Sequence, residues 1–317
     1  MFHLRRPHLV WLAAVVPIGF VLVAGTFGVA WLTAPSTSDL GALVRRLERR
    51  AGTRPVRLSA IAPVMREAVV ATEDERFYRH DGIDIVGIFR AIPYDVSHLS
   101  LAQGASTITE QLAKLVYLGG DDHSPWRKLR DAALALRIDA AYPKQRILDD
   151  YLNTVYFGAG ADGIRAAAER YFGVPPAALD LAQATLLAGL IQDPSADQPY
   201  ADPADARQRQ ADSLRSMVRD GYATEREARH ALTKPLPLAH GPPLSPLRGV
   251  SLEPGPPFYW AELGLGGGLL ALGIGGLIAV RRAGAGLTVV ARVAARGAGA
   301  IAAATGALLV LASLRSA

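Results

Sequence analysis

The feature that most constrains this chain is an uncharged apolar run near its N-terminus, from Leu9 to Thr33. A transmembrane helix needs about 20 predominantly apolar residues, so this run is long enough to span a bilayer. Two arginines precede the run, and a cleaved signal peptide has a shorter apolar core. We therefore predict an uncleaved anchor over residues 1–35, although Gly28 and Ala30 also fit a small-residue cleavage site.

Composition agrees with membrane segments and excludes several kinds of chemistry. Half of the 317 residues are hydrophobic and the mean hydropathy is positive, which is unusual for a soluble protein. The absence of cysteine excludes a disulfide framework, a zinc–thiolate site and a thiol nucleophile. The net charge of +5 suits an anionic partner: nucleic acid, a phospholipid surface or a diphosphate substrate. Composition does not choose among them.

A basic segment over residues 36–57 follows the predicted anchor. One interpretation is a solvated helix face, and another is a basic collar that lies on anionic lipid headgroups. The segment carries more positive charge than the N-terminus, which conflicts with a simple positive-inside orientation. The residues concerned are Arg45, Arg46, Arg49 and Arg50, beside Leu43 and Leu47.

Residues 58–232 have the character of one mainly α-helical globular domain. A run rich in alanine and leucine from Leu181 to Ile191 predicts a buried helix that ends before Asp193-Pro194. Alternating, strand-like runs are almost missing. A second helix is predicted from apolar residues that recur at helical spacing, namely Ile147, Leu148, Tyr151, Leu152 and Val155.

Four segments are predicted beyond this domain. Prolines are dense over residues 233–257, a composition typical of an extended linker. Residues 258–280 form a second apolar span that opens with three aromatic residues, as interfacial belts do. A basic loop over 281–296 precedes a candidate third membrane segment over 297–317. That last segment is short, so a buried amphipathic or hairpin segment is the alternative.

The first group of residues that could carry chemistry is Glu73-Asp74-x-x-Phe77-x-x-His80-x-Gly82. On a helix, residues 73, 77 and 80 share one face, which would place a carboxylate, an aromatic ring and an imidazole together. The structural alternative is a charged helix end that is stopped by glycine.

The second group lies between Gly104 and Lys114, where small and hydroxyl residues precede an apparent helix start. Helix N-termini offer free N–H groups that suit phosphate or diphosphate. Ser106 and Thr107 lie at this start, and Gln111 and Lys114 add a polar contact and a cation. A Ser/Thr N-cap on an ordinary helix is the alternative.

The third group is Arg127, Lys128 and Asp131. Arg127 and Asp131 are four residues apart and would share a helix face. One interpretation is a surface ion pair. The other is a phosphate-binding group, in which Arg127 and Lys128 bind phosphate and the Asp131 carboxylate binds a metal or stabilises a developing charge.

Together these motifs, in this order and spacing, resemble the family 51 glycosyltransferases, the peptidoglycan polymerase domain of penicillin-binding proteins. The resemblance covers roughly residues 58–220. It continues through Lys144-x-x-Ile147-Leu148-x-x-Tyr151-Leu152-Asn153, Tyr156-Phe157-Gly158, Tyr171-Phe172-Gly173, Leu186 to Ile191, and Ala206-Arg207 with Arg209-Gln210. No Ser-x-x-Lys transpeptidase motif follows residue 232, so the chain resembles the monofunctional members.

The resemblance implies a lysozyme-like, mostly α-helical fold and an inverting transfer between lipid-linked disaccharide pyrophosphates. This would take place on the extracytoplasmic side of the cytoplasmic (inner) membrane. Glu73 matches the catalytic base. Asp131 matches the second catalytic carboxylate and is the expected ligand of Mg²⁺ or another divalent cation. Substrate binding is expected of the residues that match the family's cleft: Asp74, Phe77, His80, Ser106, Thr107, Gln111, Lys114, Arg127 and Lys128.

The implied partners are the lipid-linked precursor, the nascent glycan, membrane lipids and a transpeptidase, without nucleic acid. Three residues depart from the family pattern: Asp131 replaces a glutamate, Leu115 a frequent asparagine and Glu110 a common glutamine. Asp131 and the additional C-terminal membrane segments keep open a second hypothesis, a non-catalytic relative that binds precursor or glycan and recruits partners. The intact Glu73 favours the enzyme, because a pure binding protein needs no base.

Overall fold

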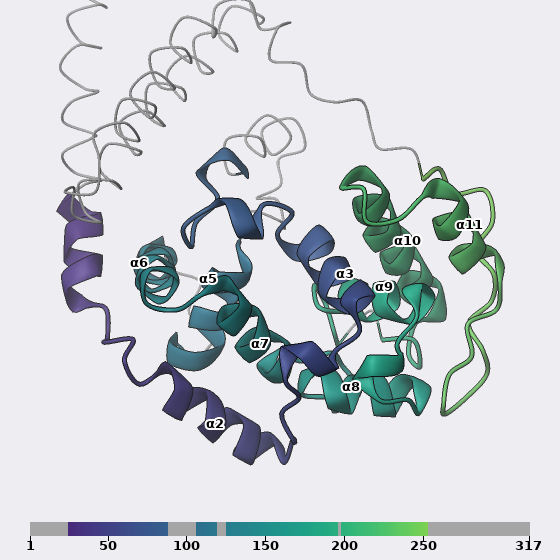
Figure 1. The fold of residues 1–317 in the computed structure, drawn as a ribbon, viewed down its shortest axis with the longest axis horizontal. Coiled ribbons are helices and arrows are strands. Elements are labelled where there is room, and N and C mark those ends of the chain that lie inside the picture. Colours follow the sequence, from purple (N-terminus) through teal and green to yellow (C-terminus); the bar gives the residue numbers. More distant parts are fainter. Residues whose placement is uncertain (1–24, 88–105, 119–124, 196–197, 253–317) are drawn as a thin grey trace, which may run out of the picture. The chain divides into compact units, whose positions relative to one another are not determined.

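The computed structural model describes residues 25–87, 106–118, 125–195 and 198–252, and these are mainly α-helical (Figure 1). This confirms the predicted helical class for the described part, where no β-strand occurs and only isolated bridges are found. The helices are α2 (Leu40–Ala51), α3 (Pro63–Glu73), α5 (Ile108–Ala113), α6 (Pro125–Ala141), α7 (Lys144–Thr154), α8 (Gly163–Phe172), α9 (Leu181–Leu190), α10 (Pro203–Arg219) and α11 (Glu225–Thr233). Short turns are η1 (Leu58–Ala60), η2 (Phe77–Arg79), the π-helical η3 (Lys114–Leu118) and η4 (Pro176–Ala178). This mainly helical architecture is consistent with the lysozyme-like fold that the resemblance implies.

Helix α9 is the centre of the packed core. Residues 184–190 are all buried, which confirms the prediction of a buried helix over Leu181–Ile191. Helices α3 and α10 pack against it, and Figure 1 shows α3 and α9 side by side. A Cβ on Gly189 would lie 2.7 Å from the carbonyl oxygen of Arg209, so only glycine lets the backbones of α9 and α10 approach this closely.

Helix α7 confirms the other predicted periodicity. Its apolar residues are fully buried, and the helix packs against α5 and α8. Asn153 near its end binds the chain that leads into α3: its Oδ1 accepts from Val56 N at 2.7 Å, and its Nδ2 donates to Val56 O at 2.9 Å. This pairing fixes the start of α3 relative to α7.

Residues 25–33 are helical and lead into α2. Arg137 on α6 holds the end of this helix, donating to Trp31 O and to Ala34 O, with its guanidinium 4.8 Å from the centre of the Trp31 ring. On α2, the side facing the core carries Leu40 and Val44, while the four arginines of the basic segment are exposed. That exposure fits both interpretations of the segment.

Within the described residues, no helix is long and apolar enough to cross a membrane. The predicted spans over 1–35, 258–280 and 297–317, and the basic loop over 281–296, fall mainly outside the described residues.

Residues 234–252, part of the predicted proline-rich linker, fold back on α10 and α11. Arg207 on α10 is buried and holds this segment, donating to the carbonyl oxygens of Leu232 at 2.9 Å, Lys234 at 2.7 Å and Ser245 at 2.8 Å. Leu252 is fully buried in the apolar cluster between α10 and α11. The segment has little regular structure, as its prolines predict, but it is packed against the helices.

We expect Arg207→Met to lower the free energy of unfolding by about 3 kcal/mol, because it leaves the buried carbonyl oxygen of Leu232 and the partly buried ones of Lys234 and Ser245 without this donor. Urea unfolding of the full chain in detergent would measure the change. Arg229→Met is the matched control. Arg229 is exposed on α11 and pairs with Glu225 at 3.1 Å, so its loss should cost no more than about 1 kcal/mol. Equal losses in the two variants would contradict the role of Arg207.

Candidate active site

Glu73 is the last residue of α3, and its side chain is half-buried. Its Oε2 accepts a hydrogen bond from Nε2 of Gln111 at 2.7 Å. Its Oε1 is buried and makes no hydrogen bond. Burial raises the pKa of Glu73 to about 7, although the Gln111 bond lowers it. A carboxylate with this pKa and with one oxygen atom that makes no hydrogen bond is suited to accept a proton near neutral pH.

Gln111 is itself held from the other side. Tyr151 is fully buried on α7 and donates from its hydroxyl to Oε1 of Gln111 at 2.7 Å. The amide is therefore fixed between a donor and the Glu73 carboxylate. The sequence identified Gln111 as a substrate-binding residue and Tyr151 only as a core residue. Their contact joins positions 40 residues apart, which no local pattern reveals.

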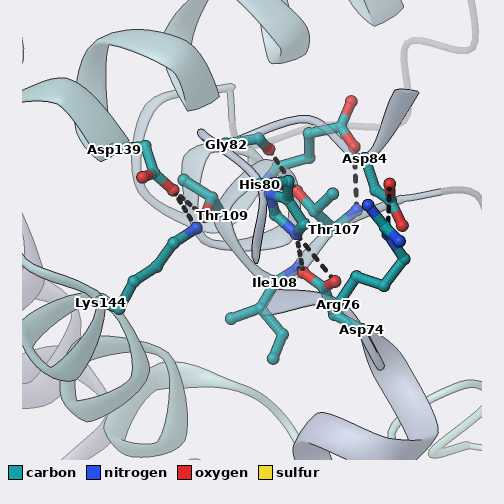
Figure 2. Close-up of polar contacts among 11 residues, drawn as sticks. Asp74, Arg76, His80, Gly82, Asp84, Thr107, Ile108, Thr109, Asp139 and Lys144 are labelled. Atoms are coloured by element: carbon teal, nitrogen blue, oxygen red, sulfur yellow. Dashed lines mark hydrogen bonds and ion pairs between the residues drawn. The ribbon is translucent and has the colours of Figure 1, made fainter. Parts of the chain in front are cut away.

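Asp74, next to Glu73, is buried and fully partnered (Figure 2). Its two oxygens accept from Nε2 of His80 at 2.9 and 3.0 Å, and its Oδ2 also accepts from Ile108 N at 3.1 Å. Both Asp74 and His80 were predicted to bind substrate. In this structure they bind each other and tie the end of α3 to the start of α5.

Thr107 is the N-cap of α5 rather than an open ligand-binding group. Its Oγ1 donates to Gly82 O at 2.6 Å and accepts from Glu110 N at 3.1 Å, and Glu110 Oε2 in turn accepts from Thr107 N. Because Ile108 N is bound by Asp74 and Glu110 N by Thr107, at least two of the N–H groups expected to bind diphosphate already have partners. Glu110 completes a capping box, a position where glutamate and glutamine are both favourable.

Gly82 brings the loop after Glu73 against α6. Its φ is +93°, and a Cβ there would lie 2.5 Å from the carbonyl oxygen of Ala135. Glycine is required for both reasons. Phe77, another predicted substrate-binding residue, is fully buried in the core, with Nζ of Lys144 4.6 Å from its ring centre. Phe77 is therefore a core residue, and its ring centre lies 6.4 Å from that of His80.

A second buried carboxylate, Asp131, lies on α6 among cations. Arg127 Nη1 is 3.7 Å from its Oδ2, and its Oδ1 is buried without a hydrogen bond. Burial raises the pKa of Asp131, although the neighbouring charges lower it. Those charges are Arg127, Lys128, Lys114 and Arg130. The Arg127–Asp131 ion pair is therefore buried, which differs from the surface ion pair that the sequence left as an alternative.

The predicted cations at the edge of this group are accessible. Lys128 is exposed, and its Nζ donates to Oγ of Ser106 at 2.9 Å. Lys114 is exposed on η3. Lys128, Lys114 and Ser106 therefore meet solvent near the Asp131 carboxylate. This arrangement can bind an anionic group such as a diphosphate.

The model of the transglycosylase family matches residues 40–218, more than half of the chain and all of the groups described above. The chain belongs to the transglycosylase family. This confirms the resemblance to the family 51 glycosyltransferases and assigns the protein to a family of enzymes.

Sequence comparisons agree with this assignment. The chain is 48% identical over 173 residues to a Cupriavidus necator protein named provisionally as a transglycosylase, covering 54% of this chain and 73% of that one. It is 41% identical over 169 residues to penicillin-binding protein 1A of Aquifex aeolicus and 41% over 177 residues to penicillin-binding protein 1B of Vibrio cholerae. These matches cover 53% and 55% of this chain, but only 23% of either penicillin-binding protein.

A hollow of about 360 Å³ lies elsewhere on the transglycosylase, between α2 and the end of α7. Its lining includes Leu115, the residue that departs from the family's usual asparagine, with Glu48, Asn153 and Tyr156. None of the predicted site residues lines it. The hollow is therefore separate from the Glu73 and Asp131 groups.

The raised pKa of Glu73 makes folding stability depend on pH. Between its ordinary pKa of 4.5 and the folded value of about 7, the folded state holds a proton that the unfolded state has released. Stability from this group is therefore present at low pH and is lost as pH rises through about 7.

We expect Glu73→Gln, which cannot ionise, to raise the free energy of unfolding at pH 8 on the order of 2 kcal/mol, with a smaller gain at pH 5. Urea unfolding at the two pH values would measure this difference. Glu67→Gln, also partly buried on α3, is the matched control for replacing a glutamate on this helix. A gain that is equal at pH 5 and pH 8 would mean that Glu73 is already charged in the folded protein at pH 5.

Proposed function

We propose that the transglycosylase polymerises lipid-linked disaccharide–pentapeptide precursors into peptidoglycan strands, with inversion at the sugar and release of polyprenyl diphosphate. One observation carries this proposal: Oε1 of the half-buried Glu73 is buried without a hydrogen bond, in surroundings that raise the pKa of Glu73 to about 7. A protein that only binds precursor has no need of a carboxylate held in this costly state.

In the proposed mechanism, Oε1 of Glu73 accepts the proton of the acceptor sugar hydroxyl as that oxygen attacks the donor sugar carbon. Gln111 holds Oε2, so the carboxylate cannot turn away from the acceptor. The departing diphosphate gains negative charge as the sugar–phosphate bond breaks. Lys128, Lys114 and the Arg127 guanidinium, which are cations near Asp131, would stabilise that charge.

Asp131 is the residue that would hold a divalent cation. Its Oδ1 is a hard oxygen ligand without a hydrogen bond, which fits Mg²⁺. The described residues contain no group of three histidine, aspartate or glutamate side chains for a metal, so an all-protein cage is not found there. Mg²⁺ commonly binds through one or two carboxylates plus substrate phosphates, and it would neutralise diphosphate charge.

We further propose that the enzyme is anchored in the cytoplasmic membrane with its helical domain on the extracytoplasmic side, beside a transpeptidase partner. The apolar run from Leu9 to Thr33 supports the anchor. The names of the penicillin-binding relatives support a function in cell-wall synthesis.

Glu73→Gln should reduce polymerisation of labelled lipid-linked precursor by about 10²–10⁴-fold, because it removes the base and keeps the shape. Precursor binding by the variant should persist. The control is Glu67→Gln, which should polymerise at the parental rate. Parental activity in Glu73→Gln would rule out Glu73 as the base, while an inactive parent that still binds precursor would favour the non-catalytic relative.

A Mg²⁺ titration of polymerisation tests Asp131. We expect Asp131→Ala to lose most activity and its metal dependence, and Asp131→Glu, which restores the family's side chain, to equal or exceed the parent. Asp150→Ala is the matched control, since Asp150 is also buried and four residues after its arginine partner, Arg146. Equal rates and equal metal dependence in the parent and both Asp131 variants would show that Asp131 has no catalytic role.

A further inference from the structure

The Gln111 side chain connects three helices through two hydrogen bonds. Its Nε2 donates to Glu73 at the end of α3, and its Oε1 accepts from Tyr151 on α7, each at 2.7 Å. Gln111 itself lies on α5. The hydroxyl of Tyr151 is therefore two hydrogen bonds away from the carboxylate that is proposed to act as the base.

The direction of these bonds matters because an amide has two unlike ends. Its NH₂ only donates and its oxygen only accepts. If the amide turned over, Oε1 would face the Glu73 carboxylate and repel its charged form. The hydroxyl proton of Tyr151 would then lose its acceptor, and no other bond from this hydroxyl is found among the described residues. A buried donor without a partner is unfavourable, so Tyr151 opposes the turn.

We propose that Tyr151 is a positioning residue that fixes the amide of Gln111, so that its NH₂ faces Glu73 and favours the charged, proton-accepting carboxylate. This inference rests on the proposed role of Glu73 as the base. It assigns to Tyr151 a function beyond core packing, although its ring is fully buried. Gln111 then acts on Glu73 and not only on substrate.

The other groups around Glu73 do not replace this contact. Asp74, on the same segment, raises the pKa of Glu73 and so opposes the charged form. Burial raises the pKa of Tyr151 well above its ordinary value, so its hydroxyl keeps its proton to donate. On α10, which packs against α3, Arg219 is paired with Glu75 at 3.0 Å and with Asp220 at 2.8 Å. Helix α9 contributes no charged residue.

The test measures the titration of Glu73 directly, by carbon-13 NMR of the glutamate carboxyl groups in the full chain in detergent, with Glu73→Gln to assign the signal. We expect Tyr151→Phe to raise the midpoint of the Glu73 titration by up to about one pH unit. The free energy of a neutral hydrogen bond is similar to that of a pKa change of one unit. Tyr171→Phe is the matched control. Tyr171 is also fully buried, but its hydroxyl donates to Phe157 O at 2.9 Å, so the midpoint should stay at the parental value.

A double-mutant cycle separates action through Gln111 from general disturbance. Gln111→Leu should itself raise the midpoint, and adding Tyr151→Phe to it should cause no further change. An unchanged midpoint in Tyr151→Phe, or a full additional shift in the Gln111→Leu background, would overturn the proposal.

The polymerisation rate gives a second, independent measurement. In Tyr151→Phe, the acidic limb of the pH–rate profile should move upward by the same amount as the NMR midpoint, with the rate at high pH largely kept. A lower rate at every pH with an unmoved limb would indicate a purely structural role and would overturn the proposal. If the NMR midpoint shifts as expected while the parent does not polymerise, the positioning role of Tyr151 is supported and the proposed function fails.

Discussion

The carboxylate of Asp74 is the interaction on which the geometry of the site depends. By accepting from His80 and from the main chain at Ile108, it joins the end of α3, the turn after η2 and the start of α5. Glu73 precedes it by one residue, so this junction also fixes where the Glu73 side chain begins. The two adjacent carboxylates differ in one respect that decides their roles: Asp74 has partners for both oxygens, whereas Oε1 of Glu73 has none.

Two carboxylates in the described part of the chain, Glu73 and Asp131, are held with one buried oxygen lacking a hydrogen bond. Such atoms are uncommon in folded proteins because burying a polar atom without a partner destabilises the fold. The apolar packing around α9, with α3 and α10 against it, stabilises the fold enough to tolerate this. Exceptions to such rules tend to mark functional sites, and these two carboxylates both belong to groups that the sequence singled out.

The departures from the family pattern have different structural consequences. Glu110 completes the capping box of α5, so it serves the helix start as a glutamine would. Leu115 lines the hollow beside α2, which none of the predicted site residues lines. Asp131 occupies the buried position beside Arg127 and is the departure that bears on chemistry.

Sequence alone determined the helical class, the positions of α7 and α9, and the order of the motifs, because helical periodicity and helix-stop signals act over a few residues. It also singled out Glu73 and Asp131 as candidate catalytic residues. Only the tertiary structure decided how the site residues divide. Phe77 is buried in the core, Thr107 caps α5, and Asp74 and His80 bind each other. Tyr151 and Gln111, 40 residues apart, meet only when α5 packs on α7. The packing of residues 234–252 through Arg207 was likewise beyond prediction from sequence. Apart from Phe77, each case involves a side chain that could form hydrogen bonds with several partners along the sequence, and three-dimensional packing selects one.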